Sequence, residues 1–438
     1  MVSMLIGNSY SRISNLSAQQ HKQLRKILSY RVDNYFSGRP PYRVSLLSSK
    51  GDFPTGLLPR VEKFNSKYSI KSTINSRPIK PESSINAPKP QLTLTPRPEQ
   101  NDAANSVRLH NRGIIVMPTG CGKSLVAILM VGNISLPTLI VVPNLGLKQQ
   151  LTESFIQAYG RENVGNLKEN KHIAIDNIDA LPLDSKIYSK YKALILDEYH
   201  HSAAKTYQKL NKRAWQGIYY RYGLTATPFR TNTEDRLLLE SIISGVIYRL
   251  SHKEAVAKGY IVPVEAYYIE LPRQRTRGQR WAAVYNELVV NNEFRNDRIA
   301  DILRKLSNFS TLCLVKEIEH GNILSYKSQV DFANGEESNA TYLVDRFNAQ
   351  IIKPLIGTVG VLGEGVDTRP CEYVIVAGLG KARGAFMQWV GRGSRLYPDK
   401  TSCKVILFKD SSHKWMLNHF KEQCKILREE YGIEAVQL

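Results

Sequence analysis

Short apolar runs alternate with segments that fit buried or amphipathic helices along most of this chain. The first series of runs occupies residues 113–117, 138–143, 192–197 and 222–226. A second series follows at residues 311–315, 352–361, 372–377 and 403–408. Runs that are apolar at every position are typical of central strands in a parallel sheet that helices cover on both faces. The pattern therefore predicts two α/β domains in tandem.

The first 90 residues follow a different pattern. Residues 16–28 have helical periodicity, whereas residues 43–47 and Phe53–Val61 are typical of short strands and turns. Residues 77–98 are rich in Pro and Ser, which disfavour helices and indicate a linker. We therefore expect a small α+β N-terminal domain with its linker at residues 1–90, an α/β domain at 91–250, an interdomain linker at 251–264 and a second α/β domain at 265–438.

Composition adds to this picture mainly through charge. The chain has 438 residues, of which 42% are hydrophobic and 23% are charged, as is usual for globular domains with buried cores. Its formal net charge of +21 indicates a polyanionic partner, because Lys and Arg bind phosphates by releasing counterions. Residues 1–100 hold 16 Lys and Arg against five acidic residues, a net charge of +11. A solvated surface with a general positive bias would give the same numbers, so charge alone leaves both interpretations open.

Two classes of protein are not indicated. No stretch approaches the roughly 18 to 20 apolar residues of a membrane span, and the first residues are too short and uncharged for a secretory signal. We therefore expect a cytoplasmic protein with no membrane partner. The five cysteines are scattered and form no C-x-x-C pair, so neither a disulfide framework nor a zinc site is indicated.

A phosphate loop is the first candidate for chemistry. Residues 117–124 read Met-Pro-Thr-Gly-Cys-Gly-Lys-Ser and lie between an apolar strand and an apolar-faced helix. Small residues let backbone N–H groups approach phosphate oxygens, while Lys123 supplies charge for the β- and γ-phosphates and Ser124 a hydroxyl for Mg²⁺. Met117 replaces the first glycine of the full Walker pattern. An ordinary strand–turn–helix would also fit so short a motif.

Two adjacent acidic residues at the end of a later strand complement this loop. In Leu194-Ile-Leu-Asp-Glu-Tyr-His200, Asp197 is placed to hold Mg²⁺ and Glu198 to orient and deprotonate an attacking water. A solvated turn would also place paired acids here, but the phosphate loop upstream favours a nucleotide site. His200 is placed to link the γ-phosphate site to its surroundings.

A third motif lies near the end of the chain, at residues 388–395, which read Gln-Trp-Val-Gly-Arg-Gly-Ser-Arg. Gln388, Arg392 and Arg395 are spaced i, i+4 and i+7, which predicts one face of a helix. Gly391 and Gly393 each cost a helix about 1 kcal/mol, and close approach to a ligand would explain them. The two arginines would then reach a γ-phosphate from the second α/β domain, although an exposed basic helix face is the alternative.

Taken in order, these motifs resemble those of the superfamily 2 helicases over roughly residues 95–400. The matching segments are motif I at 117–124, motif Ia at 142–150, motif II (D-E-x-H) at 197–200, motif III at 223–230, motif V at 363–367 and motif VI at 388–395. The resemblance implies two tandem RecA-like domains, with ATP as the nucleotide and Mg²⁺ as its metal ion.

The resemblance also implies further roles. Thr225 and Thr227 would couple hydrolysis to strand movement, and Gly365 and Asp367 would line the nucleotide and nucleic-acid cleft. Arg392 and Arg395 would act as arginine fingers, and Gln388 belongs to the same coupling motif. Arg97 and Gln100 resemble an adenine-reading R-x-x-Q, although Glu99 stands where the family has an aromatic residue. The expected nucleotide-binding residues are Arg97, Gln100, Pro118, Thr119, Gly120, Cys121, Gly122, Lys123, Ser124, Asp197, Gly365 and Asp367; the expected catalytic residues are Lys123, Glu198, Arg392 and Arg395.

Within the superfamily, the chain is most similar to the UvsW-like phage helicases and to their RecG-like and XPB-like relatives. The resemblance rests on the Pro-Phe-Arg that ends motif III, on Ala255–Pro263, on Asn291–Asn296 and on the basic N-terminal part. It implies an ATP-dependent DNA helicase or translocase that unwinds or branch-migrates forked or junction DNA in replication, recombination or repair. Residues 1–90 would then hold the duplex or the junction.

Three other functions remain open from the sequence. A DExH-type RNA helicase would share every catalytic residue. An ATP-driven translocating subunit of a restriction-like complex would need a nuclease on a partner chain. A nucleic-acid-binding switch would use ATP only to change conformation, without turnover stimulated by nucleic acid.

Overall fold

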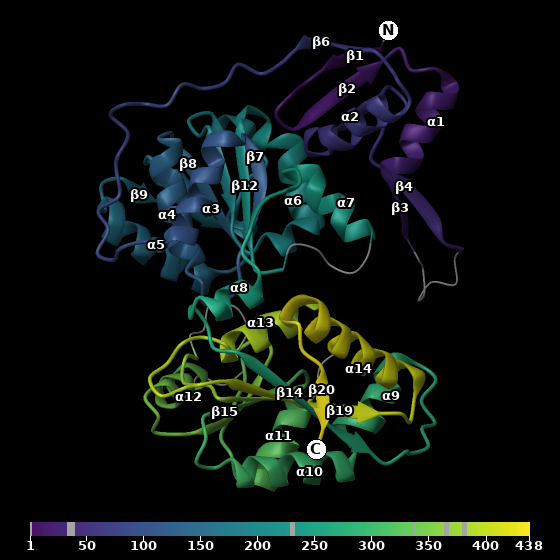
Figure 1. Cartoon of the computed structure of the whole chain (residues 1–438), viewed down its shortest axis with the longest axis vertical. Helices are drawn as coiled ribbons and strands as arrows, with labels where there is room; N and C mark the ends of the chain where they lie inside the picture. Colours follow the sequence, from purple (N-terminus) through teal and green to yellow (C-terminus); the bar gives the residue numbers. More distant parts are fainter. Residues whose placement is uncertain (1, 33–39, 228–232, 337–338, 363–367, 379–382) are drawn as a thin grey trace. The chain divides into compact units, whose positions relative to one another are not determined.

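The computed structural model describes residues 2–32, 40–227, 233–336, 339–362, 368–378 and 383–438. The chain divides into two compact units. Unit 1 comprises residues 1–117 and 122–249, and unit 2 comprises residues 118–121 and 250–438. Each unit contains a seven-stranded sheet flanked by helices (Figure 1).

The N-terminal part of unit 1 is a small α+β fold. Its four strands are ordered β5-β2-β1-β6, with β1 antiparallel to β2 and parallel to β6. A separate antiparallel pair, β3 and β4, follows α1 (Figure 1). The bounds are β1 (Val2–Leu5), β2 (Tyr10–Ser14), α1 (Ala18–Ile27), β3 (Ser29–Val32), β4 (Tyr42–Ser45), β5 (Asp52–Pro54), α2 (Leu58–Lys67) and β6 (Ser72–Ser76).

The helix predicted over residues 16–28 is present as α1. Its N-terminus is capped by Ser17, whose Oγ accepts a hydrogen bond from the Gln20 N–H at 3.2 Å. The strands and turns predicted for residues 53–61 are wrong beyond β5, because a 3-10 turn at Thr55–Leu57 leads directly into α2. A proline lies in the first turn of α2, where its missing N–H costs no helical hydrogen bond.

This N-terminal fold shares its core with α7 (Thr233–Ile242) of the same unit. Leu237 is 1% exposed and packs in the hydrophobic cluster that includes Phe53 and Leu57. At the edge of this contact, Arg60 Nε lies 2.5 Å from Glu240 Oε2. The α7 side chains therefore complete the core of the N-terminal fold. The domain boundaries expected from the sequence stay a prediction.

The large sheet of unit 1 is ordered β13-β7-β12-β11-β8-β10-β9, and its neighbouring strands pair in parallel. Strand β12 pairs with β7 on one side and β11 on the other, which brings the carboxyl ends of these three strands together. The strands are β7 (Arg112–Val116), β8 (Thr138–Val142), β9 (Val164–Gly165), β10 (Ile173–Asn177), β11 (Ala193–Leu196), β12 (Tyr220–Thr225) and β13 (Val246–Arg249). The helices are α3 (Pro98–Leu109), α4 (Lys123–Ile134), α5 (Leu145–Tyr159), α6 (Lys205–Arg213) and α7.

The sheet of unit 2 is ordered β16-β17-β15-β18-β19-β14-β20, again with parallel pairs. Its strands are β14 (Val264–Leu271), β15 (Thr311–Val315), β16 (Phe332–Ala333), β17 (Pro354–Thr358), β18 (Tyr373–Val376), β19 (Cys403–Asp410) and β20 (Ala435–Gln437). Its helices are α8 (His252–Ala257), α9 (Trp281–Tyr285), α10 (Glu293–Lys305), α11 (Ile318–Ser328), α12 (Ala340–Asn348), α13 (Arg383–Gly393) and α14 (Lys414–Ile426). The two parallel sheets confirm the predicted fold class.

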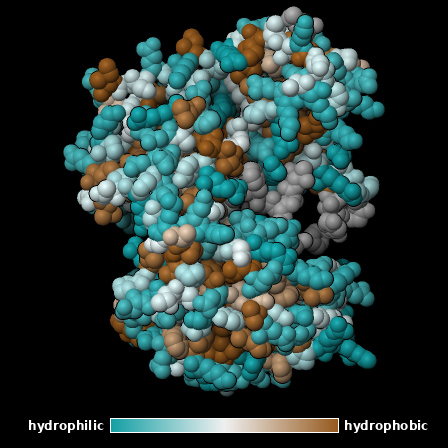
Figure 2. Space-filling model, viewed as in Figure 1, coloured by the Kyte–Doolittle hydropathy of each residue, from teal (hydrophilic) through white to brown (hydrophobic). Residues whose placement is uncertain are grey.

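Residues 77–97 connect β6 to α3 without a helix or strand (Figure 1). The connection is held to unit 1 by backbone hydrogen bonds, from Ser84 N–H to Ser135 O at 3.0 Å and from Gln91 N–H to Ala158 O at 2.7 Å. Among the described residues, no helix has the length and apolar character needed to cross a bilayer. Hydrophilic residues cover much of the face shown in Figure 2, and hydrophobic residues are scattered among them on both units.

Candidate functional site

The phosphate loop follows β7 directly. The Met117 N–H donates a hydrogen bond to Thr225 O at 3.1 Å, which ties the start of the loop to the end of β12. Gly120 and Gly122 have φ values of +90° and +79°, in the left-handed region that glycine enters without steric cost. Helix α4 then begins at Lys123, so its unpaired backbone N–H groups and its positive dipole end lie at the loop. This geometry is that of an anion-binding helix N-terminus.

Gln100 lies against this loop, although it is 22 positions away in the chain. It is 6% exposed, and its Oε1 accepts a hydrogen bond from the Arg97 N–H at 2.9 Å. A Cβ atom on Gly122 would lie only 2.4 Å from Gln100 Nε2. The structure therefore places Gln100 beside the phosphate loop, and it places the half-buried Arg97 at the start of the same helix, α3.

The two acidic residues follow β11, whose four residues are all buried. The Asp197 N–H donates to Val141 O at 2.9 Å, which extends the sheet by one residue. Glu198 then adopts a left-handed conformation with φ 42° and ψ 52°. A non-glycine residue in this region carries strain of about 1–2 kcal/mol. Such strain is common at functional sites, where the surroundings hold a side chain in one direction.

Side chains from three strand ends meet around Glu198. Lys123 Nζ lies 3.9 Å from Glu198 Oε1, and His200 Nδ1 lies 3.4 Å from Glu198 Oε2. The same His200 Nδ1 is 3.4 Å from Thr225 Oγ1. Thr225 Oγ1 in turn accepts a hydrogen bond from the Thr227 N–H at 3.0 Å. The structure thus joins the predicted residues of motifs I, II and III into one chain of polar contacts.

Tyr199 also belongs to this site, although no sequence motif assigned it a role. It is fully buried, its hydroxyl donates to Leu239 O in α7, and its ring occupies the space that a side chain on Gly223 would need. Burial raises the pKa of the Tyr199 hydroxyl well above its ordinary value, so it remains a donor at neutral pH. The tyrosine fixes the turn that carries Glu198 and His200. The only sequence signal was an aromatic residue between two functional ones.

The motif VI segment lies in unit 2. Gln388 and Arg392 are both in α13, but this helix ends at Gly393, so the prediction that Arg395 shares their helix face is wrong. The chain turns more tightly there, with a hydrogen bond from the Arg395 N–H to Arg392 O at 3.3 Å. The Ser394 carbonyl is taken by the Val262 N–H at 2.8 Å, which draws the chain away from the helical path.

One glycine of motif VI has a different cause from the one expected. A Cβ atom on Gly393 would lie 2.1 Å from Cys403 Sγ and 3.1 Å from Val374 Cγ2. Gly393 is therefore required by the packing of α13 on the sheet, and not by a ligand. Arg392 is 6% exposed and Arg395 is half-buried. The predicted residues Gly365 and Asp367 lie outside the described residues.

The residues at the loop fit a nucleotide with a divalent cation. A serine hydroxyl and a carboxylate, Ser124 and Asp197, are the hard oxygen donors that Mg²⁺ prefers. Gly122 leaves a backbone surface without a side chain at the helix N-terminus, and Lys123 at the start of α4 and Glu198 in the turn after β11 reach the same space. Pro118, Thr119 and Cys121 complete the loop.

Several known proteins are similar to this chain. Residues 93–230 match the family described as "Type III restriction enzyme, res subunit". The "DNA 3'-5' translocase XPB2" of Sulfurisphaera tokodaii is 24% identical over 348 residues, covering 68% of this chain and 77% of that protein. The "ATP-dependent DNA helicase uvsW" of Enterobacteria phage T4 is 20% identical over 437 residues, covering 89% of this chain and 87% of that protein. The chain is therefore similar to the UvsW-like superfamily 2 helicases.

A solved structure supports the fold of this chain over nearly its whole length. The fragment of an HsdR subunit of a type I restriction enzyme from Vibrio vulnificus has a TM-score of 0.60 at 17% identity. The alignment covers 98% of this chain and 84% of that one. This structure supports the tandem RecA-like fold class, while the family resemblance seen in the sequence is confirmed by the relatives and the family match.

Proposed function

We propose that this chain is an ATP-dependent DNA helicase or translocase that remodels forked or branched DNA. The observation that carries the proposal is the chain of contacts from Lys123 through Glu198 and His200 to Thr225. These contacts join the phosphate loop to the end of β12, which would respond to ATP hydrolysis. Relatives named as a DNA translocase and a DNA helicase support DNA as the nucleic acid.

In this proposal the site works by positioning and charge. The N–H groups of the loop and Lys123 hold the β- and γ-phosphates, and Glu198 orients the attacking water and accepts its proton. Ser124 and Asp197 would hold Mg²⁺, which would supply positive charge against the phosphate oxygens. Gln100 and Arg97 contact the adenine. Arg392 and Arg395 supply the remaining positive charge from unit 2, and Gln388 supports them.

Coupling would pass through His200. Its Nδ1 faces both Glu198 and Thr225, so a change in the charge around Glu198 alters the contact with Thr225. Thr225 is the last residue of β12, and its hydroxyl holds the turn at Thr227. A change at the γ-phosphate would therefore move Thr225 and the turn at Thr227 relative to the phosphate loop.

The N-terminal fold would hold the duplex or the junction. Three basic side chains, Lys22, Arg25 and Lys26, are exposed on α1, while Leu24 of the same helix is buried in the core. Such a surface binds phosphates without reading bases. A branched DNA would then be contacted by this surface as well as by the motor.

Lys123→Ala tests the site and Glu198→Gln tests the chemistry. Both variants should reduce ATP turnover by at least about 100-fold, in line with removal of a positioned charge or base, while Glu198→Gln keeps its affinity for the nucleotide. ATPase activity and unwinding would be measured with single-stranded DNA, duplex, fork, four-way junction and single-stranded RNA. Lys123→Ala turnover at the wild-type rate would refute the site, and stronger stimulation by RNA would favour the DExH-type RNA helicase.

Charge removal tests the N-terminal surface better than deletion, because deletion would expose Leu237 and its neighbours in α7. The triple variant Lys22→Gln, Arg25→Gln, Lys26→Gln should weaken fork binding and lower its salt dependence by about 0.9 for each phosphate that is no longer neutralised. A matched control removes two lysines and one arginine that are exposed on the same unit, Lys168, Lys186 and Arg161. Equal weakening in both variants would refute a specific role for α1.

The family match at residues 93–230 makes a translocating restriction-type subunit the second candidate. It predicts DNA-stimulated ATPase without strand separation by the purified chain, and a nuclease on a partner chain. A switch that binds ATP without DNA-stimulated turnover is tested by the same assay. The expected cytoplasmic location stays a prediction.

A further inference from the structure

Residues 272–280, which connect β14 to α9 in unit 2, form an arginine strap. The strap reads Pro-Arg-Gln-Arg-Thr-Arg-Gly-Gln-Arg. Its four arginines, Arg273, Arg275, Arg277 and Arg280, are all exposed. The residues between the first three, Gln274 and Thr276, are half-buried, as is Gly278. The chain therefore turns one set of alternate residues toward the protein and presents the arginines to solvent.

Gln274 fixes the first half of the strap to two neighbouring elements. Its backbone N–H donates to Ser412 Oγ at 2.9 Å, just beyond β19. Its side-chain Nε2 donates to Asn292 Oδ1 at 3.3 Å, immediately before α10. Both partners are in unit 2, so the strap is held by the same body that carries the sheet.

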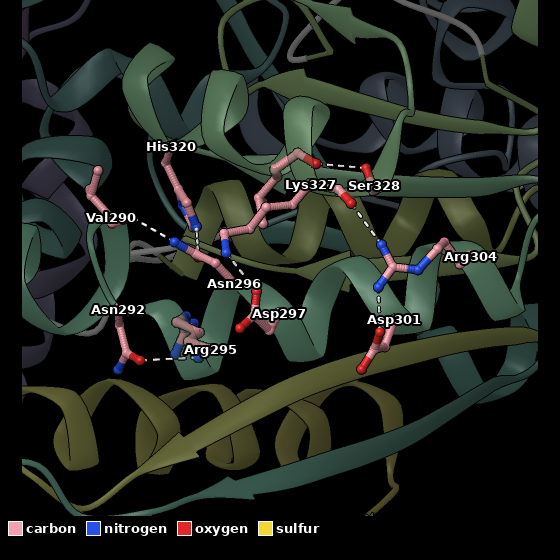
Figure 3. A network of polar contacts seen from close by, with 11 residues as sticks. Val290, Asn292, Arg295, Asn296, Asp297, Asp301, Arg304, His320, Lys327 and Ser328 are labelled. Atoms are coloured by element: carbon pink, nitrogen blue, oxygen red, sulfur yellow. Dashed lines mark hydrogen bonds and ion pairs between the residues drawn. The ribbon is translucent and has the colours of Figure 1, made fainter.

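Asn292 itself is part of a network of polar contacts, shown in Figure 3. Its Oδ1 caps α10 by accepting from the Arg295 N–H at 3.0 Å. Asn296 Nδ2 donates to Val290 O at 2.8 Å, and Asn296 Oδ1 lies 2.9 Å from His320 Nε2. The segment Asn291–Asn296, which the sequence also marked, thus forms a fixed support for the strap.

Glu287 fixes the second half of the strap. Its Oε2 accepts from Thr276 Oγ1 at 2.5 Å and from the Arg277 N–H at 3.0 Å. The hydrogen bond from Thr276 is the main reason that the pKa of the Glu287 carboxyl is lowered, and the Arg277 N–H bond adds to it. Gly278 passes so close to α9 that a Cβ atom there would lie 2.7 Å from Val284 N. The strap is therefore ordered along its length.

The four positive charges of the strap exceed the single negative charge of Glu287 that anchors it. Within the described part of unit 2, no salt bridge joins any of the four strap arginines to a carboxylate, although other surface arginines such as Arg304 and Arg428 have one. The nearby Lys409 has a carboxylate partner of its own: its Nζ lies 3.0 Å from Glu270 Oε1, and this contact is the main reason that the pKa of Lys409 is raised. The strap is therefore a surface with a net positive charge, open to an anionic partner.

We propose that the arginine strap binds the phosphate backbone of the nucleic acid on which the motor acts. Alternate residues of an extended chain lie about 6.6 Å apart, close to two steps of the roughly 3.4 Å rise per nucleotide along one strand. Guanidinium groups bind phosphate oxygens in pairs and are weakly hydrated. The strap gives contact without base recognition, as a translocating protein requires. This inference rests on the proposed function, because it assigns the proposed nucleic acid to unit 2.

The test uses the full chain with all four strap arginines changed to Gln. A matched control changes four exposed basic residues of α6, Lys205, Lys209, Lys212 and Arg213, to Gln, which removes the same charge. Affinities for single-stranded DNA, duplex and fork are measured between about 50 and 200 mM salt, together with ATPase activity without DNA and thermal unfolding. A third variant with Arg→Lys at the four positions keeps the charge.

We expect the salt slope of the strap variant to fall by about 0.9 for each phosphate no longer neutralised on duplex, or by about 0.7 on single strands, and the Arg→Lys variant to keep most of the slope. The substrate whose slope falls identifies which strand form the strap holds. Unchanged slopes, or equal decreases in the α6 variant, would overturn the inference.

The outcome also separates the strap from the proposed function. If DNA stimulates the ATPase activity of the wild type and the strap variant keeps the wild-type salt slope, only the inference about the strap is refuted. If DNA does not stimulate ATP turnover by the wild type, the proposed function itself is refuted.

Discussion

Replacing Gly122 by alanine tests the phosphate loop through a single atom. Gly122 has φ +79°, and the new Cβ would lie 2.4 Å from Gln100 Nε2. The left-handed conformation costs an alanine about 1–2 kcal/mol. Gln100 must also move, which breaks its 2.9 Å hydrogen bond to the Arg97 N–H, a contribution of about 1 kcal/mol. If the loop must regain its present shape to bind ATP, affinity falls by about 2–3 kcal/mol, or roughly 30- to 150-fold.

The assay is a titration with a fluorescent ATP analogue and Mg²⁺, paired with chemical unfolding of the same samples. Gly259→Ala is the matched control, because Gly259 has φ +66° and open space where the Cβ would lie. Its stability should fall by about 1–2 kcal/mol, the cost of the left-handed conformation alone, while its nucleotide affinity stays unchanged. The double variant Gly122→Ala, Gln100→Ala removes the collision, so its two effects should not add.

Two results would refute this reasoning. Wild-type nucleotide affinity in Gly122→Ala, with a stability decrease equal to that of Gly259→Ala, would show that the loop does not hold the nucleotide. Strict additivity in the double variant would show that Gln100 does not constrain the loop.

Three further predictions concern packing and pH. Leu237→Ala should lower the free energy of unfolding by about 2–5 kcal/mol, since it opens a cavity between α7 and the N-terminal fold. Proteolysis between residues 77 and 97 should become faster as the unfolding midpoint falls. Unchanged proteolysis would contradict the shared core. Gly393→Ala should lower the free energy of unfolding by about 1–3 kcal/mol and should also lower ATP turnover. Adding Cys403→Ala to the same protein should restore stability and turnover. If it does not, Cys403 is not the residue that excludes a side chain at position 393. Burial, assisted by the charge of Arg295, lowers the pKa of His320 to about 3, whereas an unfolded histidine titrates near 6.5. Between these two pH values the unfolded state binds the extra proton, so the free energy of unfolding should fall by up to about 1.4 kcal/mol per pH unit as the pH drops below 6.5. Urea unfolding of His320→Gln between pH 7 and 5 should show a stability that depends less steeply on pH. A slope equal to that of the wild type would contradict the lowered pKa of His320.

The sequence predicted the parts of the site that are local in the chain. Lys123 and Ser124 follow an apolar strand and open a helix, and Glu198 and His200 follow a second apolar strand. These positions are set by neighbours in the sequence, because a buried strand must be apolar and a phosphate loop must be small and flexible. The start of α1 is also set locally, because the Ser17 side chain caps the N-terminus of that helix.

Local pattern failed where distant residues set the conformation. Arg395 fits a helical spacing with Arg392, but the Val262 N–H takes the Ser394 carbonyl and the helix stops. Gly393 looked like a ligand-facing glycine, but Cys403 occupies the space beside it. Strands and turns were expected over residues 53–61, but residues 58–61 begin the helix α2, because the buried face of that helix packs into the N-terminal core.

By itself, the sequence determined that two parallel α/β sheets follow one another, and it predicted which residues carry the chemistry. The tertiary structure decided that Gln100 lies against Gly122, that Glu198 faces both Lys123 and His200, and that α7 completes the N-terminal core. It also turned the arginine strap into an ordered charged surface through Asn292 and Glu287. The physical reason is that hydrophobic period encodes which face of an element is buried, whereas the order of strands in a sheet decides which elements bury it.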